Sequence, residues 1–116
     1  MLFLMLSAWG NDMDVDCSTP LNQSEMLYCA TRQFERSEAM MINLYKSVAA
    51  ISDAAGKNKL SSAQISFESY RTSNCLWQGD KYRKKETKAQ TEAMQCQTEL
   101  TNTRIDELQK WLLEMN

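Results

Sequence analysis

The sequence predicts an all-α fold, an up-down-up three-helix bundle held together by two disulfides. Three observations carry this prediction: helical periodicity in three long segments, only three glycines and one proline, and four widely spaced cysteines. An all-β sandwich needs a turn about every 8–12 residues, which is more turn residues than this chain contains. A chain of 116 residues is long enough for one hydrophobic core, so we expect a single domain.

The first helix is predicted over residues 23–53. Asn22 and Glu25 have the capping-box spacing, in which a side-chain acceptor precedes a carboxylate that reaches back. Gly56 with Lys57 and Asn58 supplies a helix stop and a short turn. Steps of three and four place the apolar residues of this segment on one face, interrupted at Ser37: Leu27, Ala30, Phe34, Met41, Leu44, Val48 and Ile51.

The second helix is predicted over residues 59–77 and the third over 86–114, with Gly79 and Asp80 marking the break after the second helix. Short connections make consecutive helices antiparallel, which gives the up-down-up order. The expected inner face of the second helix consists of Leu60, Ala63, Phe67, Tyr70, Asn74 and Trp77. The expected inner face of the third consists of Ala93, Cys96, Leu100, Arg104, Leu108, Trp111 and Met115.

Three polar residues, Gln64, Arg71 and Arg104, lie on or beside these inner faces. A buried polar group without a partner costs ~1–3 kcal/mol, so we expect these side chains to be hydrogen-bonded. Glu25, Tyr45 and helix-end carbonyls are the expected partners. Such a polar network either fixes the register of the helices or lines a ligand groove, and we favour the structural role.

The cysteines are Cys17, Cys29, Cys75 and Cys96, and no C-x-x-C pair is present. An even number of widely spaced cysteines in a small chain indicates two disulfides and an oxidising compartment, whereas the alternative is four buried thiols in the cytosol. Folding the N-terminal arm back along the first helix joins Cys17 to Cys29, and antiparallel packing joins Cys75 to Cys96. The pairing of Cys17 with Cys75 and of Cys29 with Cys96 stays open as an alternative.

The N-terminal residues indicate export. Residues 1–10 resemble the tail of a signal peptide, with an apolar run from Leu2 to Trp9 and small residues at Ala8 and Gly10. The run is too short to span a bilayer. We expect an extended acidic arm over residues 11–22 and the helical domain over 23–116. The predicted location is periplasmic or secreted.

Composition argues against several classes of function. The net charge of −2 gives no general attraction to nucleic acid, and the absence of histidine removes the commonest catalytic base and metal ligand. The carboxylate pairs Glu35–Glu38 and Asp106–Glu107 are predicted to be solvated, and no nucleophile motif is present. We therefore expect no enzyme activity, cofactor or metal. The basic segment Lys81–Lys88 is read as a solvated loop in preference to a phosphate contact.

Four groups of residues carry a resemblance to a known family. They are Asp16–Cys17 with Glu25–Met26 and Cys29; Glu38 with Tyr45; Ala63–Gln64 with Phe67, Tyr70–Arg71 and Cys75; and Cys96 with Leu100–Thr101, Arg104 and Leu108. Over Asp16–Leu112 the chain resembles the LprI-like lysozyme-inhibitor family of bacterial envelope proteins. It departs from the family at Phe67, where tryptophan is usual, at Thr72, where aspartate is usual, and at Met41–Ile42, where Leu-Asn is usual.

The resemblance implies a small exported bacterial binding protein that inhibits lysozyme by occupying its cleft. Its partner would be lysozyme or another envelope protein, and we expect a monomer or weak dimer without a membrane span. Because lysozymes are generally basic, the candidate partner-binding residues are Asp12, Asp14 and Asp16 of the arm, together with the start of the first helix. The alternative is an envelope structural or stress-related interaction protein with no lysozyme activity.

Overall fold

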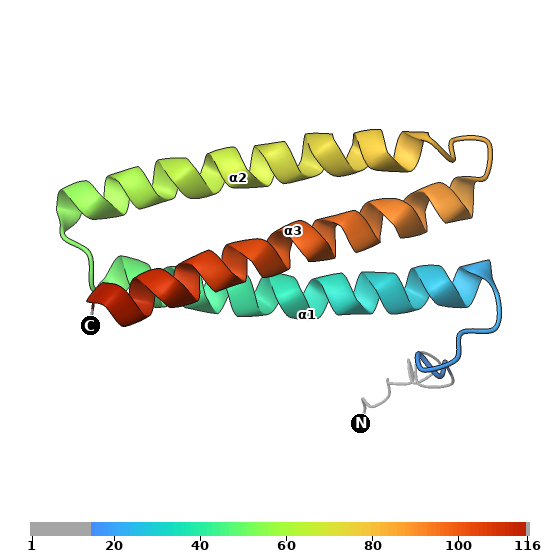
Figure 1. Ribbon diagram of the computed structural model, residues 1–116, viewed down its shortest axis with the longest axis horizontal. Coiled ribbons are helices and arrows are strands. Elements are labelled where there is room, and N and C mark those ends of the chain that lie inside the picture. The colour runs from blue at the N-terminus through green and yellow to red at the C-terminus, as the bar shows by residue number, and fades with distance from the viewer. Residues whose placement is uncertain (1–14, 116) are drawn as a thin grey trace, which may run out of the picture.

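A computed structural model describes residues 15–115, which form three helices and no strand: α1 (Gln23–Ala50), α2 (Ala54–Asp80) and α3 (Glu86–Met115). The predicted all-α three-helix bundle is confirmed. Helices α1 and α3 run parallel and α2 runs antiparallel to both (Figure 1). The start of α1 and the α2–α3 turn therefore lie at one end of the molecule, and the α1–α2 turn lies at the other. In the described part of the chain no helix is long and apolar enough to cross a bilayer.

Helix α3 is the central helix, because α1 and α2 both pack against it and hardly touch each other. As a result α3 buries two faces, whereas one was predicted. The second face carries Thr91, Thr98, Thr101 and Ile105. The hydroxyls of Thr91 and Thr98 donate to carbonyls four residues earlier, at 2.9 and 3.1 Å, which satisfies them inside the helix. Met115, expected on the inner face, is 49% exposed.

The apolar core lies toward the end of the molecule that contains the α1–α2 turn. Its four buried residues are Met41 and Val48 of α1 with Ile105 and Leu108 of α3. Partly buried residues surround them from all three helices: Leu44, Tyr45, Leu60, Phe67, Trp111 and Leu112. The opposite half of the bundle has fewer large apolar side chains and depends on the Cys75–Cys96 disulfide and on close helix packing.

The buried face of α2 differs from the prediction. Tyr70 and Trp77 are 57% and 70% exposed, and Ala63 is also exposed. Leu60 and Phe67 pack against the core as predicted. The buried positions are Gln64, Arg71, Cys75 and Gly79, and the first three come one residue after Ala63, Tyr70 and Asn74. One residue corresponds to a rotation of about 100° around a helix. The prediction followed the apolar residues, but the polar side chains occupy the contact face because they find partners there.

The helix ends show one confirmed cap and corrections to the first two helices. Helix α2 runs from Ala54 to Asp80, so Gly79 and Asp80 lie within it and do not mark a break after residue 77. Asn22 accepts from the backbone N–H of Glu25 at 2.9 Å, as the capping box predicts. The first helix ends at Ala50, however, and Asp53 is the N-cap of α2, where its carboxylate accepts from the N–H of Gly56 at 2.7 Å. An aspartate at this position satisfies the free N–H groups of the next helix. Gly56 therefore lies in the first turn of α2 and is not a helix stop.

Both predicted disulfides are present. Cys17 is bonded to Cys29 with a Cα–Cα distance of 5.6 Å, and Cys75 to Cys96 with a Cα–Cα distance of 5.4 Å. The first disulfide ties the arm to α1, and the second joins α2 to α3 near their shared turn. The alternative pairing is wrong, as is the possibility of four free thiols.

Gly79 is needed where α2 meets α3. A Cβ atom at this position would lie 2.8 Å from the carbonyl oxygen of Ala89 and 3.4 Å from the Cβ of Ala93. We expect Gly79→Ala to lower the free energy of unfolding by ~1–3 kcal/mol, because the backbones must move apart. Gly56→Ala is the matched control, since its new Cβ meets only side chains, and a change of ~1 kcal/mol or less is expected. Urea unfolding measures both, and equal effects would contradict the close approach.

Candidate functional site

Arg71 of α2 connects all three helices. Its Nη1 donates to Glu38 Oε1 of α1 at 2.6 Å and to Thr101 Oγ1 of α3 at 2.9 Å. Its Nη2 donates to the other oxygen of Glu38 at 3.4 Å, so the guanidinium and the carboxylate form a bidentate ion pair. The Arg71 side chain is 7% exposed and that of Glu38 is 29% exposed. Because α1 and α2 hardly touch elsewhere, this pair is a main link between them.

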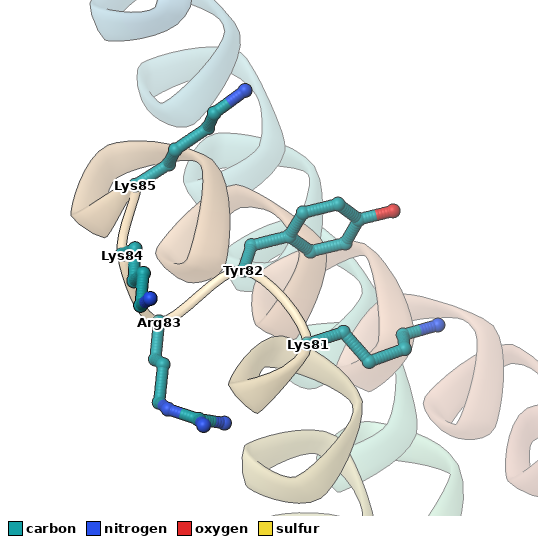
Figure 2. A pocket seen from close by; sticks show the side chains of 5 residues that line it. All are labelled: Lys81, Tyr82, Arg83, Lys84 and Lys85. Carbon is teal, nitrogen blue, oxygen red and sulfur yellow. The ribbon is translucent and has the colours of Figure 1, made fainter.

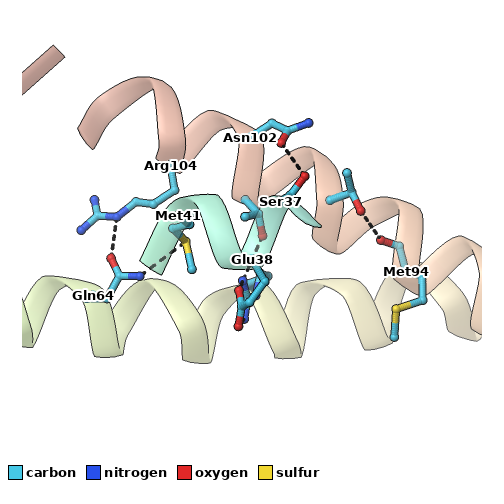
Figure 3. Close-up of polar contacts among 10 residues, drawn as sticks. Ser37, Glu38, Met41, Gln64, Met94, Asn102 and Arg104 are labelled. Atoms are coloured by element: carbon cyan, nitrogen blue, oxygen red, sulfur yellow. Dashed lines mark hydrogen bonds and ion pairs between the residues drawn. The ribbon is translucent and has the colours of Figure 1, made fainter. Parts of the chain in front are cut away.

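Arg104 of α3 makes a second three-helix connection. Its Nε donates to Gln64 Oε1 of α2 at 2.9 Å, and the amide of Gln64 lies 3.5 Å from the sulfur of Met41 in α1 (Figure 3). The Nη1 atom of Arg104 donates to Glu107 at 3.1 Å. Gln64 thus satisfies a buried arginine and contacts a core residue at the same time.

Aromatic rings alternate with these two arginines through the interior. Each guanidinium carbon lies between two rings, at 5.1 and 5.5 Å for Arg71 and at 5.6 and 5.1 Å for Arg104. Cation–π contacts of this kind contribute up to ~2 kcal/mol where water is excluded. Each of these two guanidinium groups also has one buried nitrogen without a hydrogen-bond partner in the described structure, Arg71 Nε and Arg104 Nη2. We call the series the arginine–aromatic ladder: Phe34, Arg71, Phe67, Arg104 and Trp111.

Three of the five residues predicted to form the polar network, Gln64, Arg71 and Arg104, lie in or beside this ladder. The other two lie elsewhere. Glu25 accepts from the N–H of Leu21 at 3.0 Å at the start of α1, and Tyr45 packs against the apolar core.

Sequence reasoning missed Glu38 and Thr101 as partners of Arg71. The expectation that Glu38 lies on a solvated face is wrong, because this carboxylate holds a buried arginine. A signal was available: Glu38 is four residues after Phe34 and three before Met41, which places it on the apolar stripe of the first helix. Asp106 and Glu107 are exposed, as predicted.

Three solvent-open hollows lie at the end of the molecule that carries the α2–α3 turn, away from the ladder. The first, about 360 Å³, is lined by Lys81, Tyr82, Arg83, Lys84 and Lys85 (Figure 2). The second involves Gln23 of α1 together with Lys85–Lys88, and the third lies between α2 and α3 beside Leu76 and Arg83. This end therefore presents concave, basic surface to solvent.

The described part of the acidic arm, residues 15–22, forms a small turn before α1. Asp16 organises it: one carboxylate oxygen accepts from the N–H of Ser18 at 2.9 Å and the other from the hydroxyl of Thr19 at 3.3 Å. The Cys17–Cys29 disulfide anchors the turn to α1. The arm projects from the side of α1 that faces away from α2 (Figure 1). Asp12 and Asp14 lie outside the described residues.

Comparison with known families identifies the chain. The model of the family described as "Lysozyme inhibitor LprI" matches residues 15–108, which include both disulfides and every member of the ladder except Trp111. This chain belongs to the LprI family. No curated protein and no solved structure gave a significant match.

The departures from the LprI pattern now have structural positions. Phe67 stands between Arg71 and Arg104, so an aromatic ring occupies the position at which the resemblance led us to expect tryptophan. Thr72 is exposed and Ile42 is 39% exposed, so these two departures lie on the surface. Met41 is fully buried, and its sulfur lies 3.5 Å from the amide nitrogen of Gln64.

Proposed function

We propose that this protein is a non-catalytic lysozyme inhibitor that acts in the periplasm or as a secreted protein of the bacterial envelope. The family match over residues 15–108 is the observation that carries the proposal. All four cysteines form disulfides, which is typical of proteins that fold outside the reducing cytosol. A helical domain held by cross-links and a buried ladder offers a rigid shape, and rigidity lowers the entropy lost on binding.

The acidic arm is the proposed contact surface. Asp16 is exposed, and its turn is held by two hydrogen bonds and a disulfide. Leu21, near the end of the arm, is 82% exposed. Two carboxylates flank the bond that a lysozyme cleaves, so any segment that fills the cleft blocks the substrate. The acids of the arm would steer the protein toward a basic enzyme, while Leu21 would supply apolar contact. The ladder would serve as internal support and not as a ligand groove.

We expect the purified, disulfide-intact protein to slow the clearing of peptidoglycan suspensions by at least one of the c-type, g-type and i-type lysozymes. Neutralising the arm with D12N/D14N/D16N should weaken inhibition by about tenfold at low salt, because electrostatic steering is lost. A matched variant, E99Q/D106N/E114Q, removes the same charge from exposed positions of α3 and should inhibit like the wild type. Equal losses in both variants would refute the arm as the contact surface.

The alternative function, an envelope structural or stress-related interaction protein, makes the opposite prediction in the same assay. Absence of inhibition of all three lysozyme types at micromolar excess would overturn the proposed function. A non-denaturing sizing measurement with and without lysozyme gives an independent readout, since a one-to-one complex is expected from a monomer.

A further inference from the structure

We propose that the α2–α3 end of the bundle binds the surface of an anionic lipid bilayer. This binding surface, here called the basic end, consists of the basic segment Lys81–Lys88 and the exposed residues Leu76 and Trp77. It shares no residue with the acidic arm, although Gln23, the first residue after the arm, lines a hollow together with Lys85–Lys88. The proposal does not depend on lysozyme inhibition.

The charges at the basic end are concentrated and exposed. Between Asp80 and Lys88 five basic side chains stand against two acidic ones, in a chain whose net charge is −2. One of the acids, Asp80, is paired with Arg83 at 3.2 Å. The rest of the chain carries a net negative charge, so the positive charge is concentrated in this segment. Each lysine or arginine close to an anionic membrane adds to binding, and several together hold a peripheral protein.

The turn is ordered before it meets a ligand. The N–H groups of Tyr82, Arg83 and Lys85 each donate to a carbonyl three residues earlier, at 2.9, 3.1 and 2.7 Å. The Cys75–Cys96 disulfide closes the segment that contains the turn. The charges are therefore presented on a fixed backbone, and less entropy is lost on binding than for a flexible basic tail.

Two lysine side chains make cation–π contacts with the ring of Tyr82. The Lys88 and Lys81 ammonium groups lie 4.6 and 5.9 Å from the centre of its ring. In Figure 2 the side chains of Lys81, Tyr82 and Lys85 extend to the same side of the turn. Lipid phosphates arranged in a plane would meet several of these ammonium groups at once.

Exposed apolar side chains distinguish a bilayer from a soluble polyanion. Leu76 and Trp77 are 66% and 70% exposed, although large apolar residues are usually buried. Leu76 lines the same hollow as Arg83. Lys81, the C-cap of α2, has helical backbone angles, so Trp77 lies one helical turn before it on the same side of the helix. Tryptophan beside lysine is typical of membrane interfaces, where the ring sits at headgroup level and the ammonium reaches phosphate. The described part of the arm, residues 15–22, projects from the side of α1 that faces away from α2 (Figure 1).

The test is sedimentation of the full, disulfide-intact protein with vesicles of phosphatidylcholine alone or with 30% phosphatidylglycerol. We expect binding only to the anionic vesicles, and a loss of about 100-fold in the variant K81Q/K84Q/K85Q. The matched control, K57Q/K59Q/K110Q, changes the same charge at exposed positions of the opposite end and should bind within about threefold of the wild type. Equal losses in the two triple variants would overturn the proposal.

The apolar contribution has its own readouts. L76A/W77A should bind about tenfold more weakly, and the blue shift of tryptophan emission on adding anionic vesicles should disappear in Trp77→Phe. Both positions are exposed, so the variants are expected to fold, which circular dichroism checks. Binding to soluble polyphosphate without binding to anionic vesicles would show a polyanion site and overturn the membrane assignment.

Discussion

Replacing Arg71 with alanine is expected to lower the free energy of unfolding by ~3–5 kcal/mol, the range for breaking a buried ion pair from one side. The change leaves Glu38 and Thr101 without their shared donor and removes the cation between Phe34 and Phe67. A domain of this size is stable by only ~5–15 kcal/mol, so this single substitution takes a large part of the total. The contact between α1 and α2 should be the first to loosen.

Urea unfolding followed by circular dichroism measures the effect of Arg71→Ala. The control is Arg36→Ala, an exposed arginine of α1, for which a change within ~0.5 kcal/mol is expected. Arg71→Lys should give an intermediate loss of unfolding free energy, because an ammonium keeps the charge but cannot form the bidentate ion pair with Glu38. A loss below ~1 kcal/mol for Arg71→Ala would show that the ladder does not hold the bundle together.

Removing the Cys75–Cys96 disulfide with C75A/C96A is expected to cost ~2–5 kcal/mol. The two cysteines are 21 residues apart, and both are buried, at 1% and 8% exposure. Closing a loop of this length accounts for ~3 kcal/mol in the chain-entropy model. The half of the bundle near the α2–α3 turn has little apolar core to compensate, so its helices should separate more easily than those at the other end.

The Cys17–Cys29 disulfide should behave differently, with a cost of ~1 kcal/mol or less for C17A/C29A. Its sequence separation is 12, but residues 16–22 of the arm are exposed. Without the cross-link the arm gains freedom in the folded state as well as in the unfolded state, and the two gains largely cancel. Urea midpoints of the two double variants give the comparison, and a larger loss for C17A/C29A would contradict this account.

Local features of the sequence were sufficient for much of the fold. The Asn22–Glu25 cap, the long helical periodicities and the four spaced cysteines led to three helices and the correct pairing of both disulfides. These properties depend on residues within a few turns of each other, or on helices whose antiparallel order follows from short connections. The resemblance to the LprI family likewise rests on short groups of residues at fixed spacing, and the family model matches residues 15–108.

Only the tertiary structure decided which faces are buried and which polar groups meet. The prediction placed Tyr70 and Trp77 inside because they are aromatic, yet Arg71 takes the contact face of α2. Its partners Glu38 and Thr101 are 33 and 30 residues away in the chain, and Arg104 reaches Gln64 across 40 residues. Burying a guanidinium is unfavourable until a carboxylate and aromatic rings surround it. This environment cannot be predicted from a local sequence pattern, because it forms only when α1 and α2 pack on α3.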